Sequence, residues 1–197
     1  MKLFCNLMAG SVLFLSACKD KTASETQSAA PAIKQEPAPH PEPVYAVPDT
    51  FKAALGKVFD GYAGIQIALA QDDLEKAKLA FSNMHGILHM MPIDQLDPTA
   101  KAYWDSTDAR IMEVLHPMAS AASLEATRGF FIDFTQVLTD AIEKIGLRED
   151  HPAYLFHCPM AKDNAGAEWL QRDTVLANPY FGASMPTCGN LVKRVSG

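Results

Sequence analysis

The 197-residue chain lacks most of the patterns that mark enzymes and nucleic-acid-binding proteins. Its glycines form no phosphate-binding loop, and neither a Ser/His/Asp order nor a pair of carboxylates stands out for hydrolysis. Basic residues are the minority, with 17 Lys and Arg against 23 Asp and Glu and a formal net charge of −6. This acidic balance argues against nucleic acid as a partner and against a polybasic contact with a membrane. We expect a protein that is not an enzyme.

Long hydrophobic runs are also missing, apart from one short apolar stretch before Cys18. This stretch falls well below the roughly 20 residues that a membrane-spanning helix needs. With Lys2 ahead of it and Leu15-Ser16-Ala17-Cys18 behind it, the segment resembles a bacterial lipoprotein signal. The resemblance implies a signal peptide over residues 1–17 and lipid attachment at Cys18. We therefore expect a periplasm-facing protein held on a bacterial membrane by lipid alone. Because Lys19 follows Cys18, the outer membrane is slightly favoured.

Residues 18–48 are rich in proline, alanine, serine and charged residues, and they offer no material for a hydrophobic core. Segments of this composition stay extended, at about 3.1 Å per residue. We expect a lipid-anchored linker that holds a single domain, residues 49–197, away from the membrane.

Four amphipathic stretches follow one another between residues 49 and 145, with apolar residues at spacings of three and four. The turn at 71–73 separates the first two, and Asp97-Pro98 is a typical start for the third. Ser123 is the predicted N-cap of the fourth, and Gly146 its C-terminal stop. No alternating run is long enough to predict a strand. The expected fold is an all-α, antiparallel up-down four-helix bundle with a loop-rich C-terminal segment.

Soft donor atoms recur in two short segments near the C-terminus, residues 157–161 and 185–189. Thiols and thioethers select soft ions such as Cu(I), and the prolines beside each pair stiffen the backbone that presents them. The candidate metal ligands are His157, Cys158, Met160, Met185 and Cys188.

The same region carries further motifs, namely Tyr154, Gly166-Ala167-Glu168-Trp169-Leu170 and Asn178-Pro179-Tyr180-Phe181-Gly182. Together with the sulfur segments, and with Arg128, Phe131 and Phe134 upstream, they resemble an uncharacterised periplasmic helical domain family. That family occurs in exported bacterial proteins and as the C-terminal extension of adaptor subunits of heavy-metal (copper and silver) efflux systems. The resemblance covers residues 50–193 and implies a role in handling copper and related cations. It also implies a metal-efflux adaptor or another envelope protein as partner.

Two functions from different classes remain open. In the first, the protein binds a soft metal ion, Cu(I) or Ag(I), for heavy-metal handling or efflux. In the second it is a non-catalytic interaction module locked by a Cys158–Cys188 disulfide, which closes a loop of about thirty residues and contributes roughly 3.7 kcal/mol in the chain-entropy model. Zinc is a weaker alternative because the usual C-x2-C or H-x3-H spacing is missing from this segment. A thiol oxidoreductase is disfavoured because the two cysteines do not form a C-x-x-C pair.

A second cluster of metal-binding residue types lies in the second amphipathic stretch, where His85 and His89 are four residues apart. This spacing allows two imidazoles to share a metal ion, but alone it is a weak signal. The neighbouring Met84 and Met91 belong to the apolar stripe and are expected to fill the core.

Overall fold

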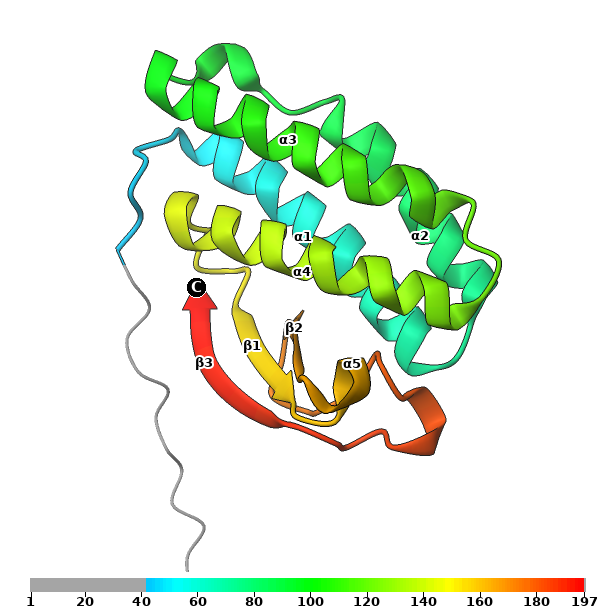
Figure 1. The fold of residues 1–197 in the computed structure, drawn as a ribbon. Coiled ribbons are helices and arrows are strands. Elements are labelled where there is room, and N and C mark those ends of the chain that lie inside the picture. The colour runs from blue at the N-terminus through cyan, green and yellow to red at the C-terminus, as the bar shows by residue number, and fades with distance from the viewer. Residues whose placement is uncertain (1–41, 197) are drawn as a thin grey trace, which may run out of the picture. The chain divides into compact units, whose positions relative to one another are not determined.

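The computed structural model describes residues 42–196. They form four long helices, followed by a small antiparallel sheet (Figure 1). The helices are α1 (Asp49–Ala70), α2 (Leu74–Leu88), α3 (Pro98–Ala119) and α4 (Leu124–Ile145). None of the helices in the described range is long and apolar enough to cross a membrane. The predicted signal peptide, the lipidation site Cys18 and most of the predicted linker lie outside the described residues.

The helices begin and end where their capping residues require, which confirms the helical part of the prediction. The Asp97 carboxylate accepts the backbone N–H groups of Thr99 at 2.8 Å and Ala100 at 3.1 Å. The Ser123 hydroxyl accepts the N–H of Ala126 at 3.2 Å, and α4 ends at Gly146, which has a φ of 81°. These contacts satisfy N–H groups that the first turn of a helix leaves unpaired.

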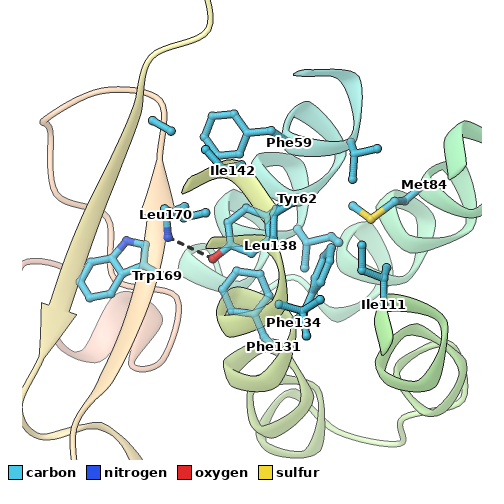
Figure 2. Close-up of a cluster of buried hydrophobic side chains, with 14 of the residues drawn as sticks. Phe59, Tyr62, Met84, Ile111, Phe131, Phe134, Leu138, Ile142, Trp169 and Leu170 are labelled. Atoms are coloured by element: carbon cyan, nitrogen blue, oxygen red, sulfur yellow. Dashed lines mark hydrogen bonds between the residues drawn. The ribbon is translucent and has the colours of Figure 1, made fainter. Parts of the chain in front are cut away.

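The apolar stripes of the four helices face one another, as their spacing predicts. Tyr62 of α1 lies at the centre, stacked on Phe131 at 4.7 Å and edge-on to Phe134 at 5.3 Å between ring centroids (Figure 2). The predicted inward residues that are fully or almost fully buried include Phe51, Leu55, Val58, Ile65, Leu69, Trp104, Ile111, Met118, Leu138 and Ile142.

The prediction of an all-α fold is wrong for the chain after α4, because this segment, besides its loops, contains a three-stranded antiparallel sheet. Its strands are β1 (Ala153–Cys158), β2 (Ala167–Gln171) and β3 (Asn190–Ser196), in the order β2-β1-β3, with a short turn α5 (Ala161–Asn164) between β1 and β2. Both β1 and β2 have consecutive buried residues instead of an alternating pattern. A short apolar run of this kind gives no periodic signal, so the fold combines helices and a sheet although the sequence predicted helices alone.

The sheet lies against α1 and α4, with α2 and α3 on the far side of these helices (Figure 1). One buried polar contact joins the two layers at the centre of the core. The Tyr62 hydroxyl accepts the backbone N–H of Leu170 in β2 at 3.1 Å (Figure 2). It also lies 2.7 Å from the hydroxyl of Thr135. Burial raises the pKa of Tyr62, so its hydroxyl stays neutral and available for both contacts.

The residues immediately before α1 pack on the helices. The backbone N–H groups of Val44 and Tyr45 donate to the carbonyl of Lys144 at 2.8 and 2.9 Å. The Tyr45 ring also stacks on Tyr103 of α3, with 4.6 Å between centroids. The end of the predicted linker is therefore attached to the domain.

Candidate functional site

The two cysteines of the C-terminal region meet at one end of the sheet. Cys158 is the last residue of β1, and Cys188 lies two residues before β3. Because β1 and β3 are antiparallel neighbours, with His157 opposite Asn190, the chain must bring Cys188 back to the end of β1. Both residues are thiols, and their Sγ atoms are 2.9 Å apart. Cys158 is fully buried and Cys188 is half-buried, so the pair is approached from the Cys188 side.

Cys158 influences the protonation of Cys188. The hydrogen bond between the two sulfur atoms is the main cause that raises the pKa of Cys188, and burial raises it further. The backbone N–H of Met160 points at the Cys188 sulfur and opposes this effect. Cys188 is therefore a protonated thiol at neutral pH, and a bound cation must displace its proton.

Met160 and Met185, the methionines of the two sulfur-containing segments, contact Cys188 through their backbones. Met160 follows Cys158 and starts α5, and its side chain is 45% exposed. It lines a cleft of about 590 Å³ together with Arg128 of α4 and Phe181. The Met185 carbonyl accepts the N–H of Cys188 at 3.2 Å, and its side chain is half-buried. Both methionines thus contact Cys188 through their backbones, and the Met160 side chain is at the surface.

His157 is directed away from the thiol pair. Successive side chains of a strand point to opposite faces of the sheet, so His157 and Cys158 cannot face the same side. His157 instead lines a separate pocket with Ile132 and Gln136 of α4. The structure brings together the two thiols and leaves the imidazole on the other face.

The donor set suits a soft ion that accepts few ligands. No three His, Cys, Asp or Glu side chains between residues 42 and 196 are grouped so that they could hold a metal ion. Structural zinc needs four such ligands in a tetrahedron, which this region does not supply. Two thiolates with a neighbouring thioether are the donors that Cu(I) selects.

Asn178 fixes the loop that carries Cys188. Its side chain is fully buried and its Nδ2 donates to the Cys188 carbonyl at 2.6 Å. Its Oδ1 accepts the N–H groups of Tyr180 at 2.7 Å and Phe181 at 3.1 Å. Its own backbone N–H donates to the Pro186 carbonyl at 2.9 Å. The side chain and backbone of Asn178 therefore join the two ends of the loop formed by residues 178–188. These contacts hold Cys188 opposite Cys158.

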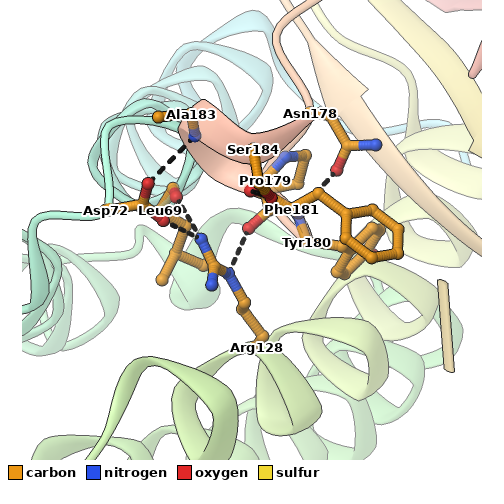
Figure 3. Close-up of polar contacts among 9 residues, drawn as sticks. All are labelled: Leu69, Asp72, Arg128, Asn178, Pro179, Tyr180, Phe181, Ala183 and Ser184. Carbon is orange, nitrogen blue, oxygen red and sulfur yellow. Dashed lines mark hydrogen bonds and ion pairs between the residues drawn. The ribbon is translucent and has the colours of Figure 1, made fainter. Parts of the chain in front are cut away.

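A second polar cluster attaches this loop to the helices (Figure 3). The Arg128 guanidinium donates to the carbonyls of Pro179 at 2.7 Å and Leu69 at 2.9 Å, and it forms an ion pair with Asp72. The other carboxylate oxygen of Asp72 accepts the N–H of Ala183 at 2.9 Å. That N–H, followed by the Arg128 guanidinium, lowers the pKa of Asp72. The cluster joins the α1–α2 turn, α4 and the Cys188 loop.

Two glycines of this loop cannot be replaced without displacing a neighbour. Gly182 has a φ of 52°, and a Cβ there would lie 2.1 Å from the Asp72 carboxylate oxygen. Gly189 has a φ of 130°, and its Cβ would lie 2.8 Å from both the His157 carbonyl oxygen and the Trp169 ring. Only glycine combines these backbone conformations with such close approach.

Aromatic residues attach the C-terminal region to the core. Trp169 is fully buried, stacked on Phe156 at 5.3 Å and edge-on to Tyr180 at 6.0 Å. The Tyr180 hydroxyl donates to the Glu168 carbonyl. Tyr180 also approaches Phe131 of α4, so these rings continue the helical core into the sheet.

Sequence reasoning did not assign roles to Asp72, Arg128 or Asn178. Asp72 looked like one polar residue of a helix–helix turn, and the other two stood only within motifs. Their partners lie up to 111 residues away along the chain, and several are backbone carbonyls or N–H groups. The Asn178-Pro179 step, a typical turn signal, was the available indication that this segment has a defined conformation.

The comparisons with known proteins concern the helical part. Residues 58–150 match the sequence model of a family described as "Protein of unknown function (DUF3347)". The matched range includes most of α1 and all of α2 to α4, and it ends before both cysteines of the sheet. No curated protein and no solved structure matches the chain. The helical part of this chain is thus similar to DUF3347, a family whose function is unknown.

Proposed function

We propose that this protein is a periplasm-facing lipoprotein that captures a soft monovalent metal ion, Cu(I) or Ag(I), between Cys158 and Cys188. The observation that supports this proposal is the 2.9 Å separation of the two Sγ atoms, one buried and one half-buried. Two converging thiolates are sufficient for a cuprous ion, which prefers soft ligands in small number. The loop clamped by Asn178 holds Cys188 opposite Cys158, which is fixed by β1.

Transfer of the ion would proceed by exchange of ligands, without covalent chemistry. Met160 is well placed for this step because it follows Cys158 in the chain and its side chain is 45% exposed at the edge of the cleft. A thioether is a neutral soft donor, so it can accept the ion from a partner and pass it to the thiolates. A metal-efflux adaptor or another envelope protein is the partner that we propose.

The proposal is tested by competition for Cu(I) under anaerobic conditions. Reduced protein is titrated against a chromogenic Cu(I) chelator, and one Cu(I) per chain is expected. Cys158→Ser or Cys188→Ser should abolish uptake because each removes one of the two thiolates. Uptake that survives both substitutions would rule out the thiol site.

Two further variants separate the thiols from their neighbours. His157→Ala should retain full uptake, because this imidazole faces the other side of the sheet. Met160→Leu should leave the stoichiometry at one and slow the transfer of Cu(I) to the chelator, because it removes the exposed soft donor without changing the volume much. Loss of uptake in His157→Ala would place the site elsewhere.

A second function is favoured by the same short separation. Two thiols in contact in an oxidising compartment can form a disulfide, and the protein would then be an interaction module that docks on an envelope partner. Thiol counting on protein taken directly from cells distinguishes the two. Free thiols with bound copper support metal capture, whereas oxidised cysteines and a partner that co-purifies with both Cys→Ser variants support the interaction module.

The membrane attachment is a separate proposal with its own test. Lipid on Cys18 should add mass to the mature chain and bring it into the membrane fraction. Cys18→Ala should remove both the added mass and the membrane association. An unchanged mass in Cys18→Ala would contradict lipid attachment.

A further inference from the structure

A second group of potential metal ligands lies between α2 and α3, away from the sheet. His85 lies in the last turn of α2 and His89 is the residue that caps its C-terminus, and both are exposed. Their ring centroids are 4.5 Å apart, with the rings nearly perpendicular. Imidazoles four residues apart on a helix lie on the same face, which is the arrangement that lets both bind one ion.

The facing helix supplies donors at matching positions. Asp108, Met112 and His116 are spaced by four residues along α3 and therefore share one face of it. Met112 and His116 line a pocket of about 360 Å³ together with His85. Three side chains with donor atoms, one from α2 and two from α3, thus line this pocket.

Asp108 lies on the same face of α3, and one oxygen of its carboxylate makes no hydrogen bond. Its Oδ1 is inaccessible to solvent and has no hydrogen-bond partner. A carboxylate oxygen without a partner is costly to bury, and it is the kind of ligand that completes a two-histidine site.

We propose that His85 and His89 chelate a divalent cation of borderline softness, such as Ni²⁺ or Zn²⁺, and that the Asp108 carboxylate is its third ligand. Imidazole and carboxylate suit such ions, whereas the thiols in the sheet suit monovalent soft ions. As the side chains lie, no three ligands within residues 42–196 converge on one point. The two imidazoles are therefore the primary chelate, and Asp108 reaches the ion by rotating its side chain. This site is independent of the function proposed for the thiols.

The experiment removes every thiol so that only the proposed site can respond. The full-length chain with all four cysteines replaced by serine is titrated with Ni²⁺ and, separately, with Zn²⁺ in a calorimeter. One ion per chain is expected. His85→Ala or His89→Ala should weaken binding roughly 100-fold. Either substitution leaves one imidazole, so the added affinity of binding the ion through two linked ligands is lost. Asp108→Asn should weaken it about tenfold through loss of the charged oxygen.

A matched control is His151→Ala, since His151 lies outside this site and contacts Asp150 instead. This variant should bind the ion as tightly as its parent. Circular dichroism and thermal melting establish that each variant is folded before titration. Absence of binding in the thiol-free parent, or equal binding in His85→Ala and His89→Ala, would overturn the site. Unchanged affinity in Asp108→Asn would overturn the assignment of the third ligand.

Discussion

The helical layer and the sheet layer of this molecule are held together by different forces. The four helices are joined mainly by apolar side chains around Tyr62 and Phe131. The chain after the sheet's second strand follows a path set by a few polar residues, above all Asn178 and Arg128. Apolar contacts are numerous and individually weak, whereas each buried hydrogen bond has one defined geometry.

This difference has a consequence for the thiol pair. The helical layer can lose a contact and still fold, because its stability is distributed over many side chains. The position of Cys188 depends on the hydrogen bonds of one loop, so a single substitution there can separate the thiols without unfolding the helices. Stability and site geometry should therefore respond to different mutations.

The largest expected effect compares two buried tryptophans, one in each layer. Trp104→Ala in α3 and Trp169→Ala in β2 should each lower the free energy of unfolding by about 3–5 kcal/mol, because both leave a large cavity. Only Trp169→Ala should also impair Cu(I) uptake, because this ring packs beside Gly189, next to Cys188. Denaturant titration and Cu(I) competition on both variants measure this. Equal loss of uptake in Trp104→Ala would contradict the separation of the layers.

Asn178→Ala should have the next largest effect on stability and a larger effect on the site. The substitution leaves two N–H groups and the Cys188 carbonyl without their partner, which we expect to cost about 2–3 kcal/mol. Because the loop is then no longer closed, the Sγ atoms should separate, and disulfide formation in a glutathione buffer should require more oxidising conditions. Asn83→Ala on the exposed surface of α2 is the matched control and should change neither quantity. A reduced stability with an unchanged thiol–disulfide equilibrium would refute the positioning role.

The same contrast explains which parts of the fold could be predicted from the sequence. The helices are encoded locally, because the capping residues Asp97 and Ser123 and the apolar spacing act within a few residues of each other. The sheet is encoded by pairing between distant segments, and β1 and β2 are too short and too evenly buried to show a period. For that reason the sequence predicted the four helices but not the strands.

The candidate site shows the same division. Residue types alone selected Cys158, Met160, Met185 and Cys188, and these do lie at one end of the sheet. His157 was included as the imidazole donor of the same motif, but strand alternation directs it to the opposite face. On a strand, the side chains of adjacent residues point to opposite faces of the sheet. Because the sequence did not predict that residues 153–158 form a strand, His157 was wrongly grouped with Cys158 as a ligand.

Tyr62→Phe tests the contact between the layers and should have a moderate effect. The substitution leaves the buried N–H of Leu170 without its acceptor, at a cost of about 1–2 kcal/mol. Thermal melting and Cu(I) competition should show a lower melting temperature and unchanged uptake, because the Cys188 loop keeps both of its polar clusters. Thr107→Val, which removes a hydroxyl bonded to a carbonyl of its own helix, is a control and should destabilise less. Impaired uptake in Tyr62→Phe would show that the layers are coupled through this hydroxyl.

The smallest expected effect concerns Asp72, and its pH dependence gives the sharpest test of the ion pair. The N–H of Ala183 and the Arg128 guanidinium lower the pKa of Asp72 in the folded protein. A carboxylate with a lowered pKa stabilises the fold at pH values above its unfolded pKa of about 3.9, and this contribution disappears as the pH falls through the folded value. Because Asp72 is partly exposed, solvent screens the pair and Asp72→Asn should cost only about 1 kcal/mol at pH 7.

The difference in stability between wild type and Asp72→Asn should therefore shrink on acidification, since protonated aspartic acid and asparagine are both uncharged. Chemical denaturation between pH 7 and the acid range measures this convergence, with the exposed Asp94→Asn as a control that should show no such trend. If Asp72→Asn stays less stable by the same amount at every pH, charge is not the basis of the contact. The N–H of Ala183 would then be the bond that matters, and the Cys188 loop would be attached to the α1–α2 turn by a neutral hydrogen bond alone.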